Sequence, residues 1–276
     1  MEDALLYNEL IQKLRTFFIN KNFIEVPAAT SLSILAACEN PFSIVTYNLT
    51  DENGNDVIYP LQQTGQMELE KILLSNPDLD GVFCITTSYR DEKNPISHRH
   101  KKVFKMFEFE AKGDMNDLIK LEKELLEFLG FGEQIEVNYE DVCEEYGNVP
   151  ILEDEHESRM WKEKGSVISL QNFPLRTSPF WNMKEGNDGT FNKVDVILYG
   201  VETIGSAARS CDKETMKKLF YEISDGGYSG KLFELFGKER VEKELEEFLK
   251  YDFFNRFGAG IGMSRLIRAY KLLKGI

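Results

Sequence analysis

The stretch RDEKNPISHRHKKVFKMFEFE, residues 90–110, decides the fold prediction, because it joins a strand end, a basic connection and a return strand. Arg90 closes the apolar segment 82–89, and the alternating residues 103–110 run back from the connection. This pattern predicts two antiparallel strands joined by a polar hairpin. A guanidinium is permanently charged and forks onto phosphate oxygens. Arg90 therefore predicts an anion-binding position, although an arginine at a strand end is by itself more often a surface ion-pair partner.

A second arginine lies far along the chain, in the segment GAGIGMSR, residues 258–265. Its small residues let a backbone or a ligand approach closely, and Arg265 sits just inside the helix expected to follow. Two arginines in these settings can hold a polyphosphate at two points, so we expect Arg90 and Arg265 to converge in one cleft. The glycines lack the Gly-x-Gly-x-x-Gly spacing of a dinucleotide-binding loop, and no parallel βαβ pattern surrounds them.

The rest of the chain predicts an α+β fold with a mostly antiparallel sheet. Apolar spacings of three and four predict a helix over 3–20, and i to i+4 charge pairs indicate a surface helix over 115–129. Helices are also expected over 66–74, 212–223, 239–250 and 263–274. Strands are expected over 23–27, 43–49, 57–60, 82–90, 103–110, 166–170, 193–199 and 202–209, and near 180–183. Residues 131–170 give mixed signals, and the glycines of 226–230 predict a loop. With no linker or repeat, we expect one domain spanning residues 1–276.

The composition is that of an ordinary globular protein, with 42% apolar and 29% charged residues. No apolar run reaches the roughly 18 residues that a bilayer span needs, and the acidic start lacks the basic region of a signal peptide. We therefore expect a cytoplasmic protein with no membrane partner. The four dispersed cysteines predict reduced thiols rather than a zinc site or a disulfide framework. A net charge of −14 opposes non-specific binding of nucleic acid.

These motifs resemble the catalytic domain of class II aminoacyl-tRNA synthetases, in the subgroup for aspartate, asparagine and lysine. The resemblance covers nearly the whole chain and implies a class II synthetase-like antiparallel β-sheet flanked by helices. The second motif of the family is matched by residues 90–110 and the third by residues 258–265. At the subgroup spacing between them, the chain has the expected residue types, namely Asp195, Gly200, Glu202, Gly205-Ser206 and Arg209.

The resemblance implies a site that adenylates an amino acid with ATP. A carboxylate attacks the α-phosphate while pyrophosphate leaves, and catalysis is mainly positioning and charge neutralisation. The catalytic residues are expected to be Arg90 at the α-phosphate and Arg265 at the γ-phosphate of a bent ATP. Further ATP-binding residues are expected to be Glu92, His100 and Phe104, with the Phe104 ring stacked on adenine. In most proteins, that phenylalanine would be core and that histidine would be solvated.

The resemblance also implies ligands for a metal and for the amino acid. Asp195 and Glu202 would supply hard oxygen ligands for Mg²⁺ between the phosphates, with surface ion pairing as the alternative. Gln66 and Glu108 are candidates for the ammonium group of the amino acid. Arg209 is the candidate for a side-chain carboxylate through a bidentate pair, which makes aspartate the predicted amino acid.

Three details depart from the expected pattern. The first motif normally carries a proline three residues past the strand valine, whereas here Pro27 follows Val26 at once and Ala29 holds the usual place. Leu69 stands where aspartate enzymes keep a substrate-binding lysine, although Lys71 lies close by. Gly205-Ser206 stands where Ser-Gly is usual, which displaces a hydroxyl that helps to hold magnesium.

Full-length tRNA synthetases of this subgroup carry an N-terminal oligonucleotide-binding barrel, whereas here the first helix begins at residue 3. We therefore expect a free-standing domain that resembles ammonia-dependent asparagine synthetase, which adenylates aspartate and passes it to ammonia. Transfer to tRNA, a protein or a small molecule is an alternative, with tRNA possible but not favoured, as is a non-catalytic regulatory subunit. A homodimer is expected because the first motif of the family forms the subunit interface, here with Leu5, Leu6 and Phe17 as apolar surface.

Overall fold

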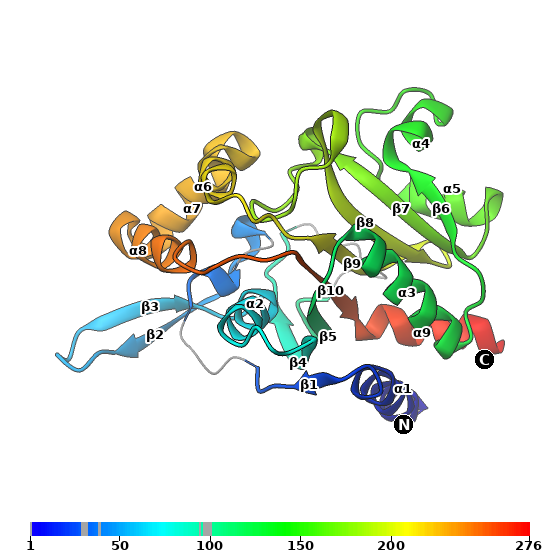
Figure 1. Ribbon diagram of the computed structural model, residues 1–276, viewed down its shortest axis with the longest axis horizontal. Helices are drawn as coiled ribbons and strands as arrows, with labels where there is room; N and C mark the ends of the chain where they lie inside the picture. Colours follow the sequence, from blue (N-terminus) through cyan, green and yellow to red (C-terminus); the bar gives the residue numbers. More distant parts are fainter. Residues whose placement is uncertain (1, 29–32, 38–39, 94, 96–100) are drawn as a thin grey trace.

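A computed structural model describes residues 2–28, 33–37, 40–93, 95 and 101–276 (Figure 1). Its main sheet has eight strands in the order β1-β4-β5-β10-β9-β8-β7-β6. These are β1 Phe23–Glu25, β4 Gly81–Tyr89, β5 Val103–Lys112, β6 Ile135–Asn138, β7 Val167–Pro174, β8 Thr190–Leu198, β9 Val201–Ala208 and β10 Arg256–Gly262. The outermost pairs, β1–β4 and β6–β7, are parallel. Every pair between them is antiparallel, which confirms the predicted α+β fold.

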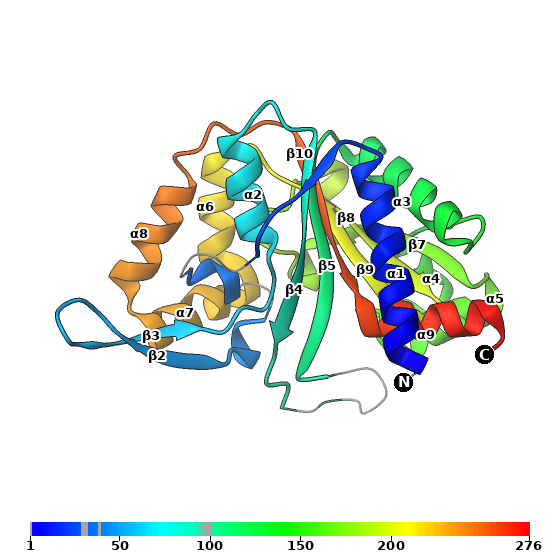
Figure 2. The same cartoon turned by 90° about the horizontal axis from the view of Figure 1, so that it is seen from below.

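Helices cover both faces of this sheet (Figures 1 and 2). On one face lie α1 Glu2–Ile19, α3 Met115–Leu129 and α9 Met263–Lys274. On the other lie α2 Gln66–Ser75, α4 Tyr139–Glu145, α5 Asp154–Glu163, α6 Lys213–Glu222, α7 Gly227–Phe236 and α8 Lys238–Phe248. A separate hairpin of β2 Thr46–Thr50 and β3 Asp56–Pro60 projects beside α7 and α8.

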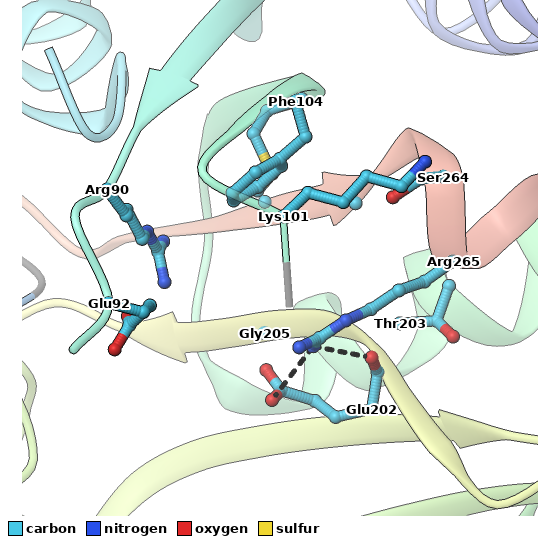
Figure 3. Close-up of a pocket in the computed structure, with 12 residues that line it drawn as sticks. Arg90, Glu92, Lys101, Phe104, Glu202, Thr203, Gly205, Ser264 and Arg265 are labelled. Carbon is cyan, nitrogen blue, oxygen red and sulfur yellow. Dashed lines mark hydrogen bonds and ion pairs between the residues drawn. The ribbon is translucent and has the colours of Figure 1, made fainter. Parts of the chain in front are cut away.

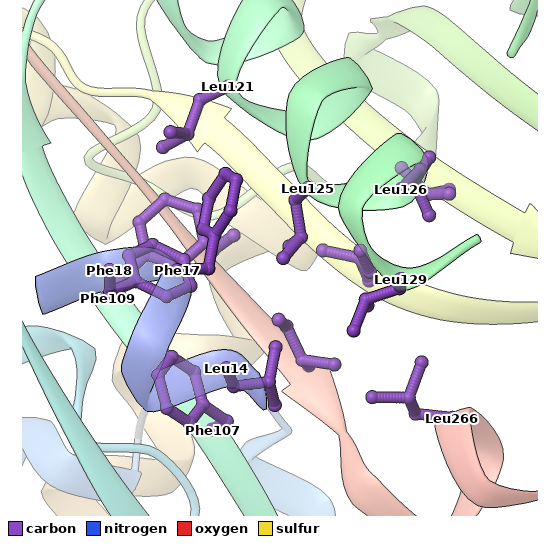
Figure 4. Packing of buried hydrophobic residues seen from close by; sticks show 14 of the residues in the cluster. Leu14, Phe17, Phe18, Phe107, Phe109, Leu121, Leu125, Leu126, Leu129 and Leu266 are labelled. Carbon is purple, nitrogen blue, oxygen red and sulfur yellow. The ribbon is translucent and has the colours of Figure 1, made fainter. Parts of the chain in front are cut away.

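The largest core lies between the sheet and the α1, α3 and α9 layer (Figure 4). Phe18 of α1 packs against Phe107 and Phe109 of β5, with ring centroids 5.1 and 4.7 Å apart. Because side chains alternate along a strand, Glu108 and Glu110 of β5 point to the opposite face. Strand β5 therefore supplies apolar side chains to the core and carboxylates to the face where the candidate site lies.

Local sequence signals explain why the predicted and observed helices agree well. Helix α3 spans 115–129, as predicted, because a capping box formed by Asp114 and Asp117 starts it. It ends at Gly130, whose φ of 88° is the left-handed conformation that glycine adopts readily. Residues 187–189 form a short 3-10 turn before β8.

Four expectations differ from the structure. The loop expected over 226–230 is the start of helix α7, because Tyr228 and Leu232 are buried in the second core. The mixed segment 131–170 contains β6, α4, α5 and the start of β7. Residues 180–183 form a turn with an isolated bridge from Met183 to Arg209 rather than a strand. Of the apolar surface predicted on α1, Leu5 is exposed, but Leu6 and Phe17 are buried in the core of the chain itself.

Two observations complete this description. Of the four cysteines, Cys84 and Cys143 are buried free thiols and Cys211 is an exposed one, while Cys38 lies outside the described residues. In the described part of the chain, each helix is too short or too polar to cross a membrane.

Candidate active site

A cavity of about 260 Å³ opens where β5, β9 and β10 meet the start of α9 (Figure 3). Strand β10 is paired on one side with β5 and on the other with β9, which brings the two motifs together. Arg90, Glu92, Phe104, Glu202 and Arg265 all line this cavity. Side chains predicted for the nucleotide phosphates, for adenine and for the metal thus share this cavity, whereas Asp195, the other predicted metal ligand, lines a second cavity described below.

Arg90 follows β4 directly, and its backbone N–H donates to the carbonyl of Lys102 at 2.8 Å, which closes the end of the hairpin. Its guanidinium carbon lies 5.4 Å from the centre of the Phe104 ring. Burial lowers the pKa of Arg90, and the carboxylates of Glu202 and Glu92 oppose this shift. A cation withdrawn from water in this way is well placed to bind an anion that replaces the lost hydration.

Arg265 enters the cavity from the opposite side, in the first turn of α9 (Figure 3). Its Nη1 donates to the backbone carbonyl of Glu202 at 2.8 Å and lies 3.4 Å from the carboxylate of the same residue. Burial lowers the pKa of Arg90, and Arg265 adds to that lowering, so the two guanidinium groups are close enough to repel each other. Glu202 lies between them and partly neutralises both.

The two predicted metal ligands face a common point. A Cβ placed on Gly205 would lie 3.0 Å from Glu202 Oε1 and 3.8 Å from Asp195 Oδ1. Asp195 Oδ2 accepts a hydrogen bond from Lys193 Nζ at 2.8 Å, whereas the buried Oδ1 has no hydrogen-bond partner among the described residues. Burial raises the pKa of Asp195 to about 7, Lys193 opposes the shift and Glu202 adds to it. Hard carboxylate oxygens with an unused acceptor fit Mg²⁺.

The described residues contain no group of three or more His, Cys, Asp or Glu side chains that could hold a metal by itself. The remaining ligands would therefore have to come from nucleotide phosphates and water, as is usual for Mg²⁺. Ser206 does not contribute its hydroxyl, because Oγ lies 3.2 Å from the Val194 carbonyl and faces Glu122 of α3. Gly205 therefore faces the cavity, and the hydroxyl of Ser206 faces the opposite side of the sheet.

A second cavity of about 480 Å³ shares Arg90 and Glu202 with the first and extends to Gln66 and Arg209. Gln66 Nε2 donates to the Ala259 carbonyl at 2.8 Å, and its Oε1 accepts from Arg209. The Arg209 guanidinium also forks onto Glu110, with Nε 3.0 Å from Oε1 and Nη2 3.1 Å from Oε2. The side chain predicted to bind a substrate carboxylate is thus already bonded to one from β5.

Glu108 is fully buried beside this second cavity. Its carboxylate accepts hydrogen bonds from the hydroxyls of Thr64 and Thr86 and from the Gly65 N–H at 2.9 Å. Burial raises the pKa of Glu108, while these donors oppose the shift. In this arrangement Glu108 fastens the start of α2 to β5, and its predicted contact with a substrate ammonium stays a prediction.

Other predicted positions lie elsewhere. Leu69 is buried against Leu73 and Val82, on the side of α2 that faces the sheet. Lys71 points away and pairs with Glu244 at 3.6 Å. His100 falls outside the described residues.

Several side chains of the site were missed by the sequence reasoning. Glu70 and Arg256 are fully buried and paired beside Arg209. Glu157 accepts a hydrogen bond from the Glu202 N–H at 2.7 Å and so holds β9 at the cavity. The FEFE alternation in β5 was the signal for Glu110, since it placed this carboxylate on the same face as Glu108.

Comparison with known proteins agrees with this geometry. The family model described as tRNA synthetases class II (D, K and N) matches residues 3–274. An asparagine–tRNA ligase of Rhodopirellula baltica is 25% identical, over 80% of this chain and 55% of the relative. A lysine–tRNA ligase of Actinobacillus pleuropneumoniae is 27% identical, over 60% of this chain and 36% of the relative. The chain thus spans about half the length, or less, of these relatives.

Solved structures show the same fold. The asparaginyl-tRNA synthetase of Pyrococcus horikoshii, in complex with asparaginyl-adenylate, superposes with a TM-score of 0.77 at 20% identity. The superposition covers 98% of this chain and 65% of that one. The asparaginyl-tRNA synthetase of Entamoeba histolytica gives 0.76 at 17% identity, over 98% of this chain and 64% of that one.

Proposed function

This chain belongs to the family of class II tRNA synthetases for aspartate, lysine and asparagine, and we propose that it uses ATP to adenylate an amino acid. The observation that carries the proposal is the convergence of Arg90 and Arg265, from opposite sides, on one cavity lined by Glu202. A binding-only relic would not need two phosphate-binding cations together with the carboxylates that could hold a metal.

Following the family resemblance, we propose a part in the reaction for each residue of the cavity. Arg90 holds the α-phosphate and the attacking carboxylate, and Arg265 holds the γ-phosphate of a bent ATP. A bond forms between the carboxylate oxygen and the α-phosphorus, and the bond to the β-phosphate oxygen breaks to release pyrophosphate. Asp195 and Glu202 would hold Mg²⁺, which supplies positive charge to the phosphates. Phe104 offers its ring to the adenine.

Aspartate is the amino acid predicted from the sequence, and the pair of Arg209 and Glu110 favours asparagine as a second candidate. A carboxamide offers both an acceptor and donors, so it can bond the guanidinium and the carboxylate together. An aspartate carboxylate offers acceptors alone and is repelled by an ionised Glu110. Burial raises the pKa of Glu110 to about 7, so aspartate should bind better at pH 6, where Glu110 is largely protonated, than at pH 8.

Exchange of radiolabelled pyrophosphate into ATP, with each amino acid in turn, tests this proposal. We expect exchange with aspartate or asparagine, and a ratio of aspartate to asparagine exchange that is larger at pH 6 than at pH 8, since protonation of the proposed metal ligand Asp195 affects both amino acids alike. If neither aspartate nor asparagine supports exchange, the proposed amino-acid substrates are wrong. A folded wild-type protein that binds ATP but gives no exchange with any amino acid would instead support a non-catalytic subunit.

When aspartate is activated, we propose ammonia as the acceptor. Attack of ammonia on the adenylate then forms asparagine and releases AMP. Asparagine produced from aspartate, ATP and ammonium, and detected by amino-acid analysis, would support this step. Label retained on tRNA, a protein or a small molecule, with no asparagine formed, would favour the alternative transfer reaction. We also propose a cytoplasmic homodimer; a monomeric mass in light scattering would contradict the dimer.

A further inference from the structure

A row of four buried charges lies beneath the amino-acid end of the site. Arg256, at the start of β10, and Glu70, in α2, are both fully buried. Nε and Nη2 of Arg256 donate to Glu70 Oε2 at 2.9 and 2.6 Å. Two charges of this kind are costly to bury unless each has a partner. Their pairing is therefore a fixed feature of this part of the fold.

Glu70 connects this pair to the site itself. Its Oε1 lies 3.7 Å from Arg209 Nε and accepts a hydrogen bond from Asn182 Nδ2 at 2.6 Å. Arg209 in turn forks onto Glu110 and donates to Gln66. Positive and negative groups thus alternate from Arg256 through Glu70 and Arg209 to Glu110, and the row has no net charge when both carboxylates are ionised.

We propose that Arg256 and Glu70 are positioning residues, which set the orientation of Arg209 and so the affinity of the site for the side chain of the amino acid. This inference rests on the proposed function. Neither residue is among those that line the first cavity, and Arg256 does not line the second either. Arg256 acts by holding Glu70, and Glu70 acts on Arg209 Nε, the same nitrogen that donates to Glu110.

The physical reason is that two carboxylates attract the Arg209 guanidinium at once, with Nε 3.0 Å from Glu110 and 3.7 Å from Glu70. Loss of both Arg256 and Glu70 removes the second attraction, and loss of Arg256 alone strengthens it, so either change moves Arg209. Arg256 occupies Oε2 of Glu70 with two donors, and Asn182 occupies Oε1. Without Arg256, Glu70 is a buried carboxylate that lacks its strongest partner. Arg209, 3.7 Å away, is then drawn toward it. That movement breaks the fork onto Glu110 and removes the guanidinium from its place beside Gln66.

Paired substitutions test this idea. The double variant Arg256→Met with Glu70→Met replaces a buried ion pair by apolar side chains of similar length, an exchange that folded proteins often tolerate. In pyrophosphate exchange, we expect its KM for the amino acid to rise tenfold or more while its KM for ATP stays within twofold. The single variant Arg256→Met, if it folds, should show a larger rise in the KM for the amino acid, again with the KM for ATP within twofold. If it does not fold, the double variant alone tests the inference.

A matched control is the surface pair of Arg15 and Glu25, which is also bidentate, at 2.9 and 2.7 Å. Arg15→Met with Glu25→Met should leave both KM values within twofold of wild type. A folded Arg256 and Glu70 double variant with an unchanged KM for the amino acid would overturn the inference and leave the proposed function standing. A wild-type protein without exchange for any amino acid would overturn both.

Discussion

Replacing Glu122 by glutamine is expected to stabilise the protein at neutral pH and to reduce the pH dependence of its stability. Glu122 lies in α3, on the face of the sheet opposite the cavity, with its side chain fully buried. Burial raises the pKa of Glu122 to about 8 from an ordinary value of 4.5, although the hydroxyl of Ser206 opposes the shift. Glutamine keeps the shape of this side chain and removes its ionisation.

The sign and the size of the stabilisation expected for Glu122→Gln follow from the linkage between protonation and folding. Between pH 4.5 and about 8 the unfolded chain loses the proton of Glu122 while the folded chain keeps it. The stability that this residue provides is therefore complete below pH 4.5 and is lost as the pH rises to about 8. At about 1.4 kcal/mol per pH unit, the full loss is on the order of 5 kcal/mol.

Urea unfolding of both proteins at several pH values between 5 and 8 measures this effect. Other buried carboxyls contribute equally to both proteins, so the difference between them isolates Glu122. We expect the advantage of Glu122→Gln to grow by about 1 kcal/mol per pH unit. Glu127→Gln, an exposed position on the same helix, should match wild type throughout. Parallel stability curves for wild type and Glu122→Gln, or a glutamine variant less stable than wild type at pH 8, would refute the reasoning.

Three further substitutions test the cavity itself. Arg265→Met should lower the rate of pyrophosphate exchange by roughly 100-fold or more, because one preorganised donor to a developing charge is worth that much; a loss below tenfold would contradict its role. Phe104→Ala should raise the KM for ATP about tenfold and spare the KM for the amino acid, since aromatic stacking on a base is worth about 1–3 kcal/mol; equal changes in both would exclude stacking. Gly205→Ser adds a hydroxyl near Glu202 and Asp195, which lie 3.0 and 3.8 Å from the new Cβ. It should lower the Mg²⁺ concentration needed for half-maximal exchange, and a higher requirement would show that the added side chain displaces Glu202.

The elements that could be predicted are those whose signals are local. The bounds predicted for helix α3 are the observed ones, and the cap at Asp114 and the glycine at 130 that fix them lie directly beside the helix in the sequence. Helix α7 was missed because its first residues include Gly227 and Gly230, which are poor helix formers. Burial of Tyr228 and Leu232 in the second core outweighs that propensity, and such burial depends on residues far away in the chain.

The same distinction holds for the candidate site. The positions of Arg90 and Arg265 followed from motifs that can be read within a few residues of each. The contacts of Arg209 with Glu110 and Glu70 could not be predicted, because they join β9, β5 and α2 across the interior. The residue type does not tell whether a glutamate side chain is buried or solvated, so only the fold distinguishes the buried Glu70 from other acidic residues.

The place of β10 in the middle of the sheet has a consequence for synthesis of the chain on the ribosome. Seven strands of this sheet emerge before it and can form at most two separate half-sheets, β1-β4-β5 and β9-β8-β7-β6. Only when residues 256–262 leave the exit tunnel can the halves be joined, through pairings that span more than a hundred residues on one side. Until that moment the edges of β5 and β9 are open to other chains, so the nascent protein is most vulnerable to aggregation just before its last strand arrives.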